Sequence, residues 1–394
     1  MTPAVYAIAT MDTKGEEARF LADRIREAGA EVRVVDVGTK GEPDAAADVS
    51  IVAIRDPDAD RGEAIAAASA ALARFLREEH AAGRLAGAVG IGGSGGTALI
   101  APALRGLPIG APKLMVSTVA AGDVSAYVGV SDLAMLPSVV DVAGLNAVSR
   151  TILGNAARAI AGMVRDARPI VVDRPALGLT MFGLTTPCVD AARKTLEARG
   201  YDALTFHATG VGGRAMEGLV RSGLIRGVLD VTTTEVADFL TGGVFPCGED
   251  RFDAQIEARI PCVLSLGALD MVNFGALATV PEKYRGRRLH VHNAQVTLMR
   301  TTPEENRRIG RWIGEKLNRW RSPVALLIPE KGLSGLDLPG GPFHDPDADA
   351  ALFETIEEVV ATDAFRVVRR LPLHVNDPKF ARALAAELLA RLDS

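Results

Sequence analysis

Cysteine is scarce in this chain, which has three cysteines, Cys188, Cys247 and Cys262, among 394 residues. They lie far apart and are odd in number, which argues against a disulfide framework, and none has the spacing of a zinc site. Reduced thiols of this kind are typical of the cytoplasm, so the sequence predicts a cytoplasmic protein.

Long apolar runs are also missing. No apolar run reaches the length that crosses a bilayer. The N-terminal segment carries Asp12, Glu16 and Glu17 and has no long apolar core, unlike a signal peptide. We therefore expect a soluble protein without a membrane partner.

Positive charge is not in excess, because 44 Lys and Arg stand against 49 Asp and Glu, a formal net charge of -5. This balance argues against general nucleic-acid binding. The hydrophobic share of 48% and the charged share of 24% are ordinary for a globular protein. A chain of 394 residues exceeds one ordinary domain and predicts two.

Apolar and helical patterns alternate along the first part of the chain. An apolar run at residues 4–9 precedes a helical pattern that stops at Gly29, and residues 31–38 form the next apolar run. Further strands are expected at 50–54, 86–91 and 113–117, and helices at 61–79 and 142–165. Strand–helix–strand alternation predicts an α/β fold with a parallel sheet.

The second part of the chain repeats the first, although generic strand–helix alternation is an alternative explanation. Three segments match in the same order, and they pair Thr10 with Thr180, Gly29 with Gly200, Gly83 with Gly223, Gly87 with Gly227, Pro112 with Pro261 and Asp123 with Asp270. We predict two pseudo-duplicated, doubly wound lobes, residues 1–170 and 178–394, with a cleft between them. A proline-containing linker at 168–178 is expected to be cut by a protease.

Ligands of doubly wound sheets bind beyond the carboxyl ends of the strands. In the first lobe these ends carry glycines, hydroxyls, a lysine and carboxylates, which together suit a polyphosphate with Mg²⁺. The candidate residues are Asp12, Thr13, Lys14, Thr39, Gly92, Gly93, Ser94, Gly95, Gly96, Thr97, Thr118, Gly122 and Asp123.

The stretch "AVGIGGSGGT" at residues 88–97 is the centre of this hypothesis. A strand, a glycine loop and a helix N-terminus expose backbone N–H groups that bind an anion, although a bare turn is the alternative. Asp12 has an alternative role as the N-cap of the first helix. Lys14 is unfavourable near the positive N-terminus of a helix unless an anion offsets its charge.

The strand ends of the second lobe carry a second set of candidates. They are Thr209, Gly210, Gly213, Arg214, Glu217, Glu235, Asp270, Asn273, His292 and Arg300. His290 and His292 are expected to be hydrogen-bonded or to face solvent, and a metal site formed by the two is the alternative. One of His207, His290 and His292 could instead act as a general base, and the sequence does not favour one of them. The glycine- and proline-rich loop near residue 335 adds Ser334, Asp337 and Asp345, whereas Asp347 and Asp349 are expected to begin a helix.

Several of these motifs resemble the Tm-1-like ATP-binding family, also called UPF0261. The resemblance rests on "ATMDTKGEE", "VGIGGSGGT", "HATGVGGRAMEGL", "DVTTTE", "GALDMVNFG" and "PEKGLSGLDLPGGPF", in this order along essentially the whole chain. It implies two Rossmann-like lobes with parallel sheets, ATP binding and self-association. Plant members carry an additional TIM barrel, so this chain is expected to work with a separate TIM-barrel protein or alone.

Three functions stay open at this point. The leading hypothesis is an ATP-binding, metabolic protein that uses Mg²⁺. The second is a lyase, hydrolase or transferase that acts on a small carboxylate or acyl substrate between the lobes, and the third is a nucleotide-sensing interaction module without catalysis. An alanine-rich segment at 139–164 suggests a homodimer, although packing on the protein's own sheet has the same composition.

Overall fold

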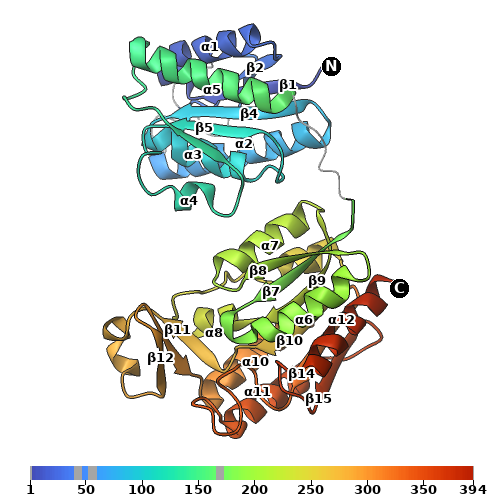
Figure 1. Cartoon of the computed structure of the whole chain (residues 1–394). Coiled ribbons are helices and arrows are strands. Elements are labelled where there is room, and N and C mark those ends of the chain that lie inside the picture. The colour runs from blue at the N-terminus through green and yellow to red at the C-terminus, as the bar shows by residue number, and fades with distance from the viewer. Residues whose placement is uncertain (1, 40–46, 52–59, 166–172, 394) are drawn as a thin grey trace. The chain divides into compact units, whose positions relative to one another are not determined.

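The structure is a computed structural model that describes residues 2–39, 47–51, 60–165 and 173–393. The chain divides into two compact units, unit 1 from Met1 to Val171 and unit 2 from Val172 to Ser394. Each unit is built on its own six-stranded parallel sheet (Figure 1).

Unit 1 contains a sheet in the order β3-β2-β1-β4-β5-β6. Its strands are β1 (Ala4–Ala9), β2 (Val32–Asp36), β3 (Val49–Ser50), β4 (Leu85–Gly92), β5 (Lys113–Ser117) and β6 (Ala134–Pro137). The chain runs outward from β1 in one direction and from β4 in the other. This is the doubly wound arrangement, and the strand order reverses between β1 and β4.

Helices cover both faces of this sheet (Figure 1). They are α1 (Met11–Glu27), α2 (Arg61–Ala81), α3 (Ser94–Arg105), α4 (Ser125–Val128) and α5 (Ala147–Arg165). Leu21 of α1 and Ile160 of α5 belong to the core on one face, whereas Leu72 of α2 and Leu104 of α3 belong to the core on the other. The helices α1 and α3 therefore approach the β1/β4 boundary from opposite faces.

Unit 2 contains a sheet in the order β15-β14-β10-β9-β7-β8. Its strands are β7 (Ala176–Met181), β8 (Asp202–His207), β9 (Ile225–Thr232), β10 (Cys262–Gly267), β14 (Val324–Pro329) and β15 (Arg366–Leu371). A separate antiparallel sheet in the order β11-β13-β12 follows β10, and its strands are β11 (Met271–Phe274), β12 (Leu289–Asn293) and β13 (Val296–Arg300).

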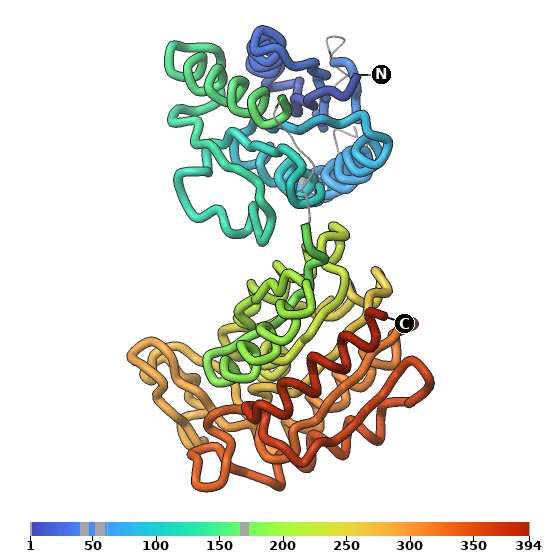
Figure 2. Tube along the Cα trace, turned by 45° about the vertical axis from the view of Figure 1, so that its right-hand side comes forward, coloured from blue at the N-terminus to red at the C-terminus, as the bar shows by residue number. Residues whose placement is uncertain are grey.

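The helices of unit 2 also form two layers. They are α6 (Thr186–Glu197), α7 (Val211–Arg221), α8 (Thr234–Thr241), α9 (Asp253–Ala258), α10 (Pro303–Leu317), α11 (Pro346–Val359) and α12 (Pro378–Leu392), with short 3₁₀ turns at Gly183–Thr185, Leu277–Thr279 and Glu282–Tyr284. Helices α6 and α12 share one core, and Figure 2 shows them side by side. Helices α7, α8, α10 and α11 share the other core.

The two units repeat one another in their details. The paired strands β2-β1-β4-β5 and β8-β7-β9-β10 have the same order. Gly29 and Gly200 both have φ of +87°, a left-handed conformation that glycine adopts without a Cβ penalty after a helix. The N–H of Ala88 donates to Pro112, and the N–H of Val228 donates to Pro261, at matching positions.

The predicted α/β fold of two Rossmann-like lobes is confirmed, but some boundaries differ. The helix predicted from residue 142 begins at Ala147, because the Asn146 carboxamide oxygen accepts hydrogen bonds from the N–H groups of Val148 and Ser149. A strand was expected at 50–54, and the structure has β3 at Val49–Ser50. Residues 52–59 lie outside the described part of the chain. The predicted linker also lies partly outside it, at residues 166–172.

The alanine-rich helix α5 packs on its own unit. Its Leu153, Ala156, Ala157 and Ile160 are buried in the same core as α1. This internal packing accounts for the small residues of the segment, so self-association stays a prediction.

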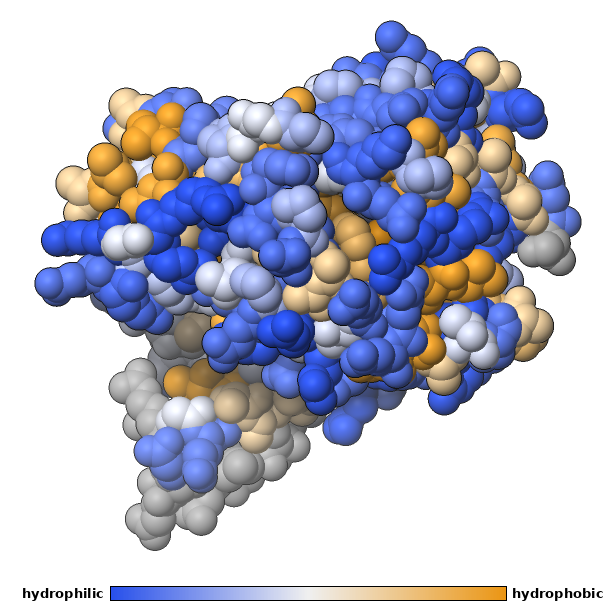
Figure 3. Space-filling model, turned by 90° about the horizontal axis from the view of Figure 1, so that it is seen from below, coloured by the Kyte–Doolittle hydropathy of each residue, from blue (hydrophilic) through white to orange (hydrophobic). Residues whose placement is uncertain are grey.

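The surface of unit 2 seen from below is mostly hydrophilic, and its apolar side chains form several separate groups (Figure 3). Single exposed apolar residues such as Val244 and Leu277 are ordinary on protein surfaces. Among the residues that the structure describes, no helix has the length and apolarity needed to cross a bilayer.

We expect the two units to fold when expressed separately, as residues 1–171 and 172–394. Every hydrophobic core cluster of the described residues consists of residues from a single unit. Circular dichroism melting should give one cooperative transition for each fragment, close to its transition in the full chain. A fragment without a cooperative transition would contradict this prediction.

Candidate functional site

The glycine loop of unit 1 lies where the strand order reverses. Strands β1 and β4 are parallel neighbours, so the loops after Ala9 and after Gly92 leave the same edge of the sheet. In doubly wound sheets this reversal opens a crevice in which ligands bind. The structure therefore brings the predicted segments at residues 10–14 and 92–97 to one edge.

Gly92 and Gly93 have different roles in this loop. A Cβ on Gly92 would lie 2.9 Å from the Cα of Gly96, so glycine lets the helix pack closely on its strand. Among the residues that the structure describes, a Cβ on Gly93 would meet nothing nearer than the Thr118 hydroxyl oxygen at 3.8 Å. The space in front of Gly93 is therefore open.

Helix α3 begins without a side-chain cap, because its N-cap residue is Gly93. The N–H groups of Ser94, Gly95 and Gly96 lie in the first turn and have no acceptor within the helix. The positive end of the helix dipole also lies here. The loop thus provides the backbone donors that an anion requires.

Thr97 was a candidate for binding a ligand, but its side chain points into the protein. Thr97 is fully buried, donates to the Gly93 carbonyl oxygen at 2.8 Å and lies 2.6 Å from the Ser117 hydroxyl oxygen. Its side chain therefore fixes the glycine loop against the end of β5, which a sequence pattern does not reveal.

Asp36 supports the neighbouring loop, and sequence analysis missed it. Its buried carboxylate accepts hydrogen bonds from the N–H groups of Met11 at 3.1 Å and Gly38 at 2.7 Å. The carboxyl carbon of Asp12 lies 3.2 Å from the position of a Cβ on Gly38. Asp12 is not the N-cap of α1, because that position is Thr10.

Lys14 has a partner other than an anion. Its ammonium donates to the Val142 carbonyl oxygen, and Glu17, one turn further along α1, accepts from the N–H of Gly144. Both residues tie α1 to the segment before α5. Of the remaining candidates, Thr13 lies in the first turn of α1, and the loops after β2 and β5 contain Thr39, Thr118, Gly122 and Asp123.

In unit 2 a buried arginine lies among three carboxylates. The Arg251 guanidinium donates to Glu217 at 2.9 Å, Asp230 at 2.7 Å and Glu235 at 3.1 Å, and all four side chains are at most 2% exposed. Burial raises the pKa of Glu217, although Arg251 opposes this shift. We call these four residues the Arg251 cluster.

The Arg251 cluster occupies the glycine loop of unit 2. The N–H groups of Gly210 and Gly213 donate to the Glu235 carboxylate at 2.6 and 3.2 Å. A Cβ on Gly213 would lie 2.3 Å from the same carboxylate. The Glu235 carboxylate, an anion of the protein itself, thus occupies the backbone donors of this loop, and Glu217 and Glu235 balance the charge of Arg251.

Other second-lobe candidates line a small cavity of about 210 Å³. Thr209 and His292 lie in its wall with His207, Phe182 and Leu298. His290 instead packs edge-on against Phe343, with ring centroids 6.2 Å apart. The two predicted histidines of β12 therefore have different surroundings.

A third group gathers around the glycine- and proline-rich loop after β14. The Ser334 hydroxyl donates to Asp270 at 2.7 Å, and the N–H of Leu333 donates to Asp337 at 2.8 Å. Asp270 and Asp337 are fully buried. One carboxylate oxygen of Asp270 has no hydrogen-bond partner among the described residues, whereas Asp337 interacts with the carboxyl group of Asp349. We call Asp270, Ser334, Asp337, Arg300 and Asp349 the acid network.

Arg300 connects this network to α11. It donates to the Asp349 carboxylate at 2.6 Å and to the Phe343 carbonyl oxygen at 2.7 Å. Asp345 is the N-cap of α11 and accepts from the N–H of Ala348. Asp349 lies in the first turn of this helix as predicted, but sequence analysis missed its contact with Arg300.

The second-lobe candidates thus do not converge on one site. Asn273 donates to the buried carboxylate of Asp238 at 3.1 Å, and Arg214 is exposed in the first turn of α7. Arg251, Asp230 and Asp238 were missed because nothing in their local sequence marks a buried charge.

We expect the free energy of unfolding of unit 2 to fall by at least about 1.4 kcal/mol, the equivalent of one pKa unit, between about pH 5 and about pH 8. Burial raises the pKa of Asp238 and of Asp270 to about 7, and the pKa of Asp349 to about 8. The unfolded chain loses these protons near pH 4. The stabilisation that these carboxyl groups contribute is therefore fully present below about pH 4 and is lost as the pH rises through their pKa values in the folded protein.

Urea unfolding checks this prediction through tryptophan fluorescence, because both tryptophans, Trp312 and Trp320, lie in unit 2. The variant Asp349→Asn should flatten the pH dependence, and the exposed Asp202→Asn should not. A wild-type stability that rises over this interval would contradict the assignment of the raised values.

Fold and site together define a class: a two-unit, Rossmann-like α/β protein with an open glycine loop at the strand-order reversal of unit 1. Residues 3–169 match the N-terminal domain, and residues 174–392 the C-terminal domain, of "Uncharacterised protein family (UPF0261)". The chain belongs to the UPF0261 family.

Relatives match over nearly the whole chain. The UPF0261 protein RA0729 of Rhizobium meliloti is 54% identical over 97% of this chain and 97% of its own length. The UPF0261 protein of Clostridium tetani is 46% identical over the full length of both. The ToMV resistance protein Tm-1(GCR237) of Solanum lycopersicum is 46% identical over 98% of this chain, which spans 56% of that protein.

Proposed function

We propose that unit 1 binds ATP at the glycine loop between β4 and α3. The observation that carries the proposal is the open space in front of Gly93, next to the uncapped N-terminus of α3. Backbone N–H groups there would hold phosphate oxygens, since a helix N-terminus binds anions without a dedicated cation. The reversal of strand order between β1 and β4 provides the crevice for the nucleotide.

The acidic residues of the same edge suit Mg²⁺. Asp12 lies in the first turn of α1, directly after β1. Asp123 lies in the loop after β5, where it accepts a hydrogen bond from the N–H of Ser125. Carboxylates and phosphate oxygens are the ligands that Mg²⁺ takes in such sites. Mg²⁺ would offset the phosphate charge beside these carboxylates.

Titration calorimetry with ATP and Mg²⁺ on the full chain tests the proposal. We expect saturable binding that weakens when EDTA removes Mg²⁺. The variant Lys14→Ala should bind ATP about 3- to 10-fold more weakly, because it removes a positive charge near the start of α1, which follows β1 at the same edge of the sheet, although the ammonium also donates to Val142. The exposed Lys194→Ala in unit 2 is the matched control and should bind like wild type.

Phosphate release measured on the same samples separates an enzyme from a binding module, since only an enzyme consumes ATP. An absence of saturable ATP binding by the folded wild type would refute the proposed function. Equal affinity of wild type and Lys14→Ala would remove Lys14 from the site and leave the glycine loop to be tested separately.

A further inference from the structure

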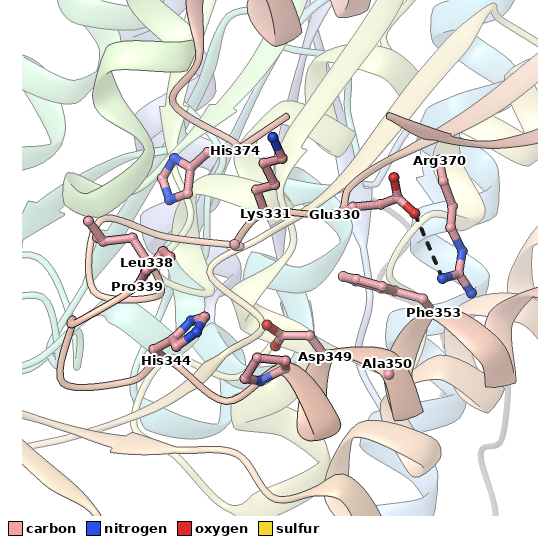
Figure 4. Close-up of a pocket in the computed structure, with 12 residues that line it drawn as sticks. Glu330, Lys331, Leu338, Pro339, His344, Asp349, Ala350, Phe353, Arg370 and His374 are labelled. Carbon is pink, nitrogen blue, oxygen red and sulfur yellow. Dashed lines mark ion pairs between the residues drawn. The ribbon is translucent and has the colours of Figure 1, made fainter. Parts of the chain in front are cut away.

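A cavity of about 730 Å³ opens at the carboxyl ends of β14 and β15 in unit 2 (Figure 4). Its volume lies in the range of small-molecule sites, and the carboxyl edge of a parallel sheet is where such sites occur. Leu338, Pro339, Pro346 and Phe353 provide apolar walls. These walls suit the apolar body of a small ligand.

One side of this cavity carries an unpaired positive charge. The Arg370 guanidinium is neutralised by Glu357 at 2.6 Å and lies 4.0 Å from Glu330. The Lys331 ammonium has no carboxylate partner among the described residues, and Figure 4 shows it on the side of His374. An unpaired ammonium beside apolar walls favours an anionic group of the ligand.

Both ring nitrogens of His374 have partners within the protein. Its Nδ1 accepts a hydrogen bond from the N–H of Asn376 at 3.1 Å, and its Nε2 lies 3.0 Å from the Ser334 carbonyl oxygen. Neither nitrogen is therefore available to a ligand. Lys331 is thus the group that would bind an anion here.

Another wall of the cavity carries the Asp349 carboxyl group, close to His344 (Figure 4). Its side chain is 9% exposed and contacts Arg300. Burial raises the pKa of Asp349 to about 8; Arg300 opposes the shift and the nearby carboxyl of Asp337 reinforces it. Asp349 also hydrogen-bonds to the Asp337 carboxyl group, so near neutral pH this pair of carboxyl groups keeps a proton. A ligand oxygen at Asp349 can accept that proton in a hydrogen bond in place of Asp337, as it does from buried neutral carboxylic acids in some active sites.

We propose that this cavity binds a small organic acid with an apolar body and a second oxygen function, a carbonyl or a hydroxyl. Lys331 pairs with the carboxylate, Phe353 and the prolines hold the apolar body, and Asp349 donates a hydrogen bond to the carbonyl or hydroxyl oxygen. The site lies wholly in unit 2 and does not depend on nucleotide binding by unit 1.

Calorimetry on the full chain with three probes tests the proposal. Phenylpyruvate has the carboxylate and the carbonyl, 3-phenylpropionate lacks the carbonyl, and phenylacetone lacks the carboxylate. Phenylpyruvate should bind at least about tenfold more tightly than either. Lys331→Met should weaken both acids about tenfold and leave phenylacetone unchanged, and the exposed control Lys379→Met should change none of them.

The pH dependence tests the role of Asp349. Wild-type affinity for phenylpyruvate should fall between about pH 7 and about pH 9, as Asp349 loses its proton. Asp349→Asn keeps a hydrogen-bond donor and should remove this fall. Absence of phenylpyruvate binding by the folded wild type, equal affinity in Lys331→Met, or an unchanged pH dependence in Asp349→Asn would each overturn the proposal.

Discussion

Replacing Gly93 with valine is expected to lower the affinity for ATP by at least about 30-fold while unit 1 stays folded. Gly93 has φ of -77° and ψ of -163°, an extended conformation that a β-branched residue adopts without strain. In the described part of the chain, a Cβ there meets only the Thr118 hydroxyl oxygen at 3.8 Å. The valine side chain would therefore fill the open space in front of the α3 N–H groups and exclude the phosphates.

Two control variants separate blocked binding from damage to the fold. Gly286→Val places the same side chain at an exposed glycine of unit 2 with nothing within 4 Å and should bind ATP like wild type. Gly92→Ala should instead destabilise unit 1, because its Cβ would lie 2.9 Å from the Cα of Gly96. Calorimetry measures affinity and circular dichroism the fold. If folded Gly93→Val binds ATP with wild-type affinity, the nucleotide does not bind at this loop.

The repeated, doubly wound fold of the two units was predictable because it rests on local patterns that repeat. Gly29 and Gly200 end their helices with the same left-handed φ, and this requirement is visible in the sequence as glycine after an amphipathic run. The additional strands, β3 in unit 1 and β15 in unit 2, lie at opposite edges of the common order, and no repeat pattern predicts where they pair.

The candidate site was predictable only in part, because side-chain direction depends on contacts that are distant in sequence. The glycine loop at residues 92–97 follows a strand and precedes a helix, as the pattern indicates. Thr97 points inward because Ser117, from the next strand, meets its hydroxyl group. The second glycine loop looks alike in sequence, yet Glu235, more than 20 residues further along, occupies it.

Replacing Arg251 with methionine is expected to destabilise unit 2 by about 3–5 kcal/mol. Three carboxylates that are at most 2% exposed would lose the guanidinium that each of them contacts within 3.1 Å. Arg251→Lys keeps the charge but cannot present three donors in the same fork, so its stability should lie between those of the methionine variant and wild type. Urea unfolding followed by Trp312 and Trp320 fluorescence measures this loss.

Arg221 is the matched control, since it approaches the same region from the surface. Its side chain is 43% exposed, and it lies 3.5 Å from Asp250 and 4.0 Å from Glu217, so Arg221→Met should change stability by less than about 1 kcal/mol. Because Glu235 also accepts from Gly210 and Gly213, loss of Arg251 should increase amide hydrogen exchange in the loop at residues 209–213 before it affects unit 1. If Arg251→Met is as stable as Arg221→Met, the three carboxylates do not depend on Arg251, and the assignment of this glycine loop to an internal ion cluster fails.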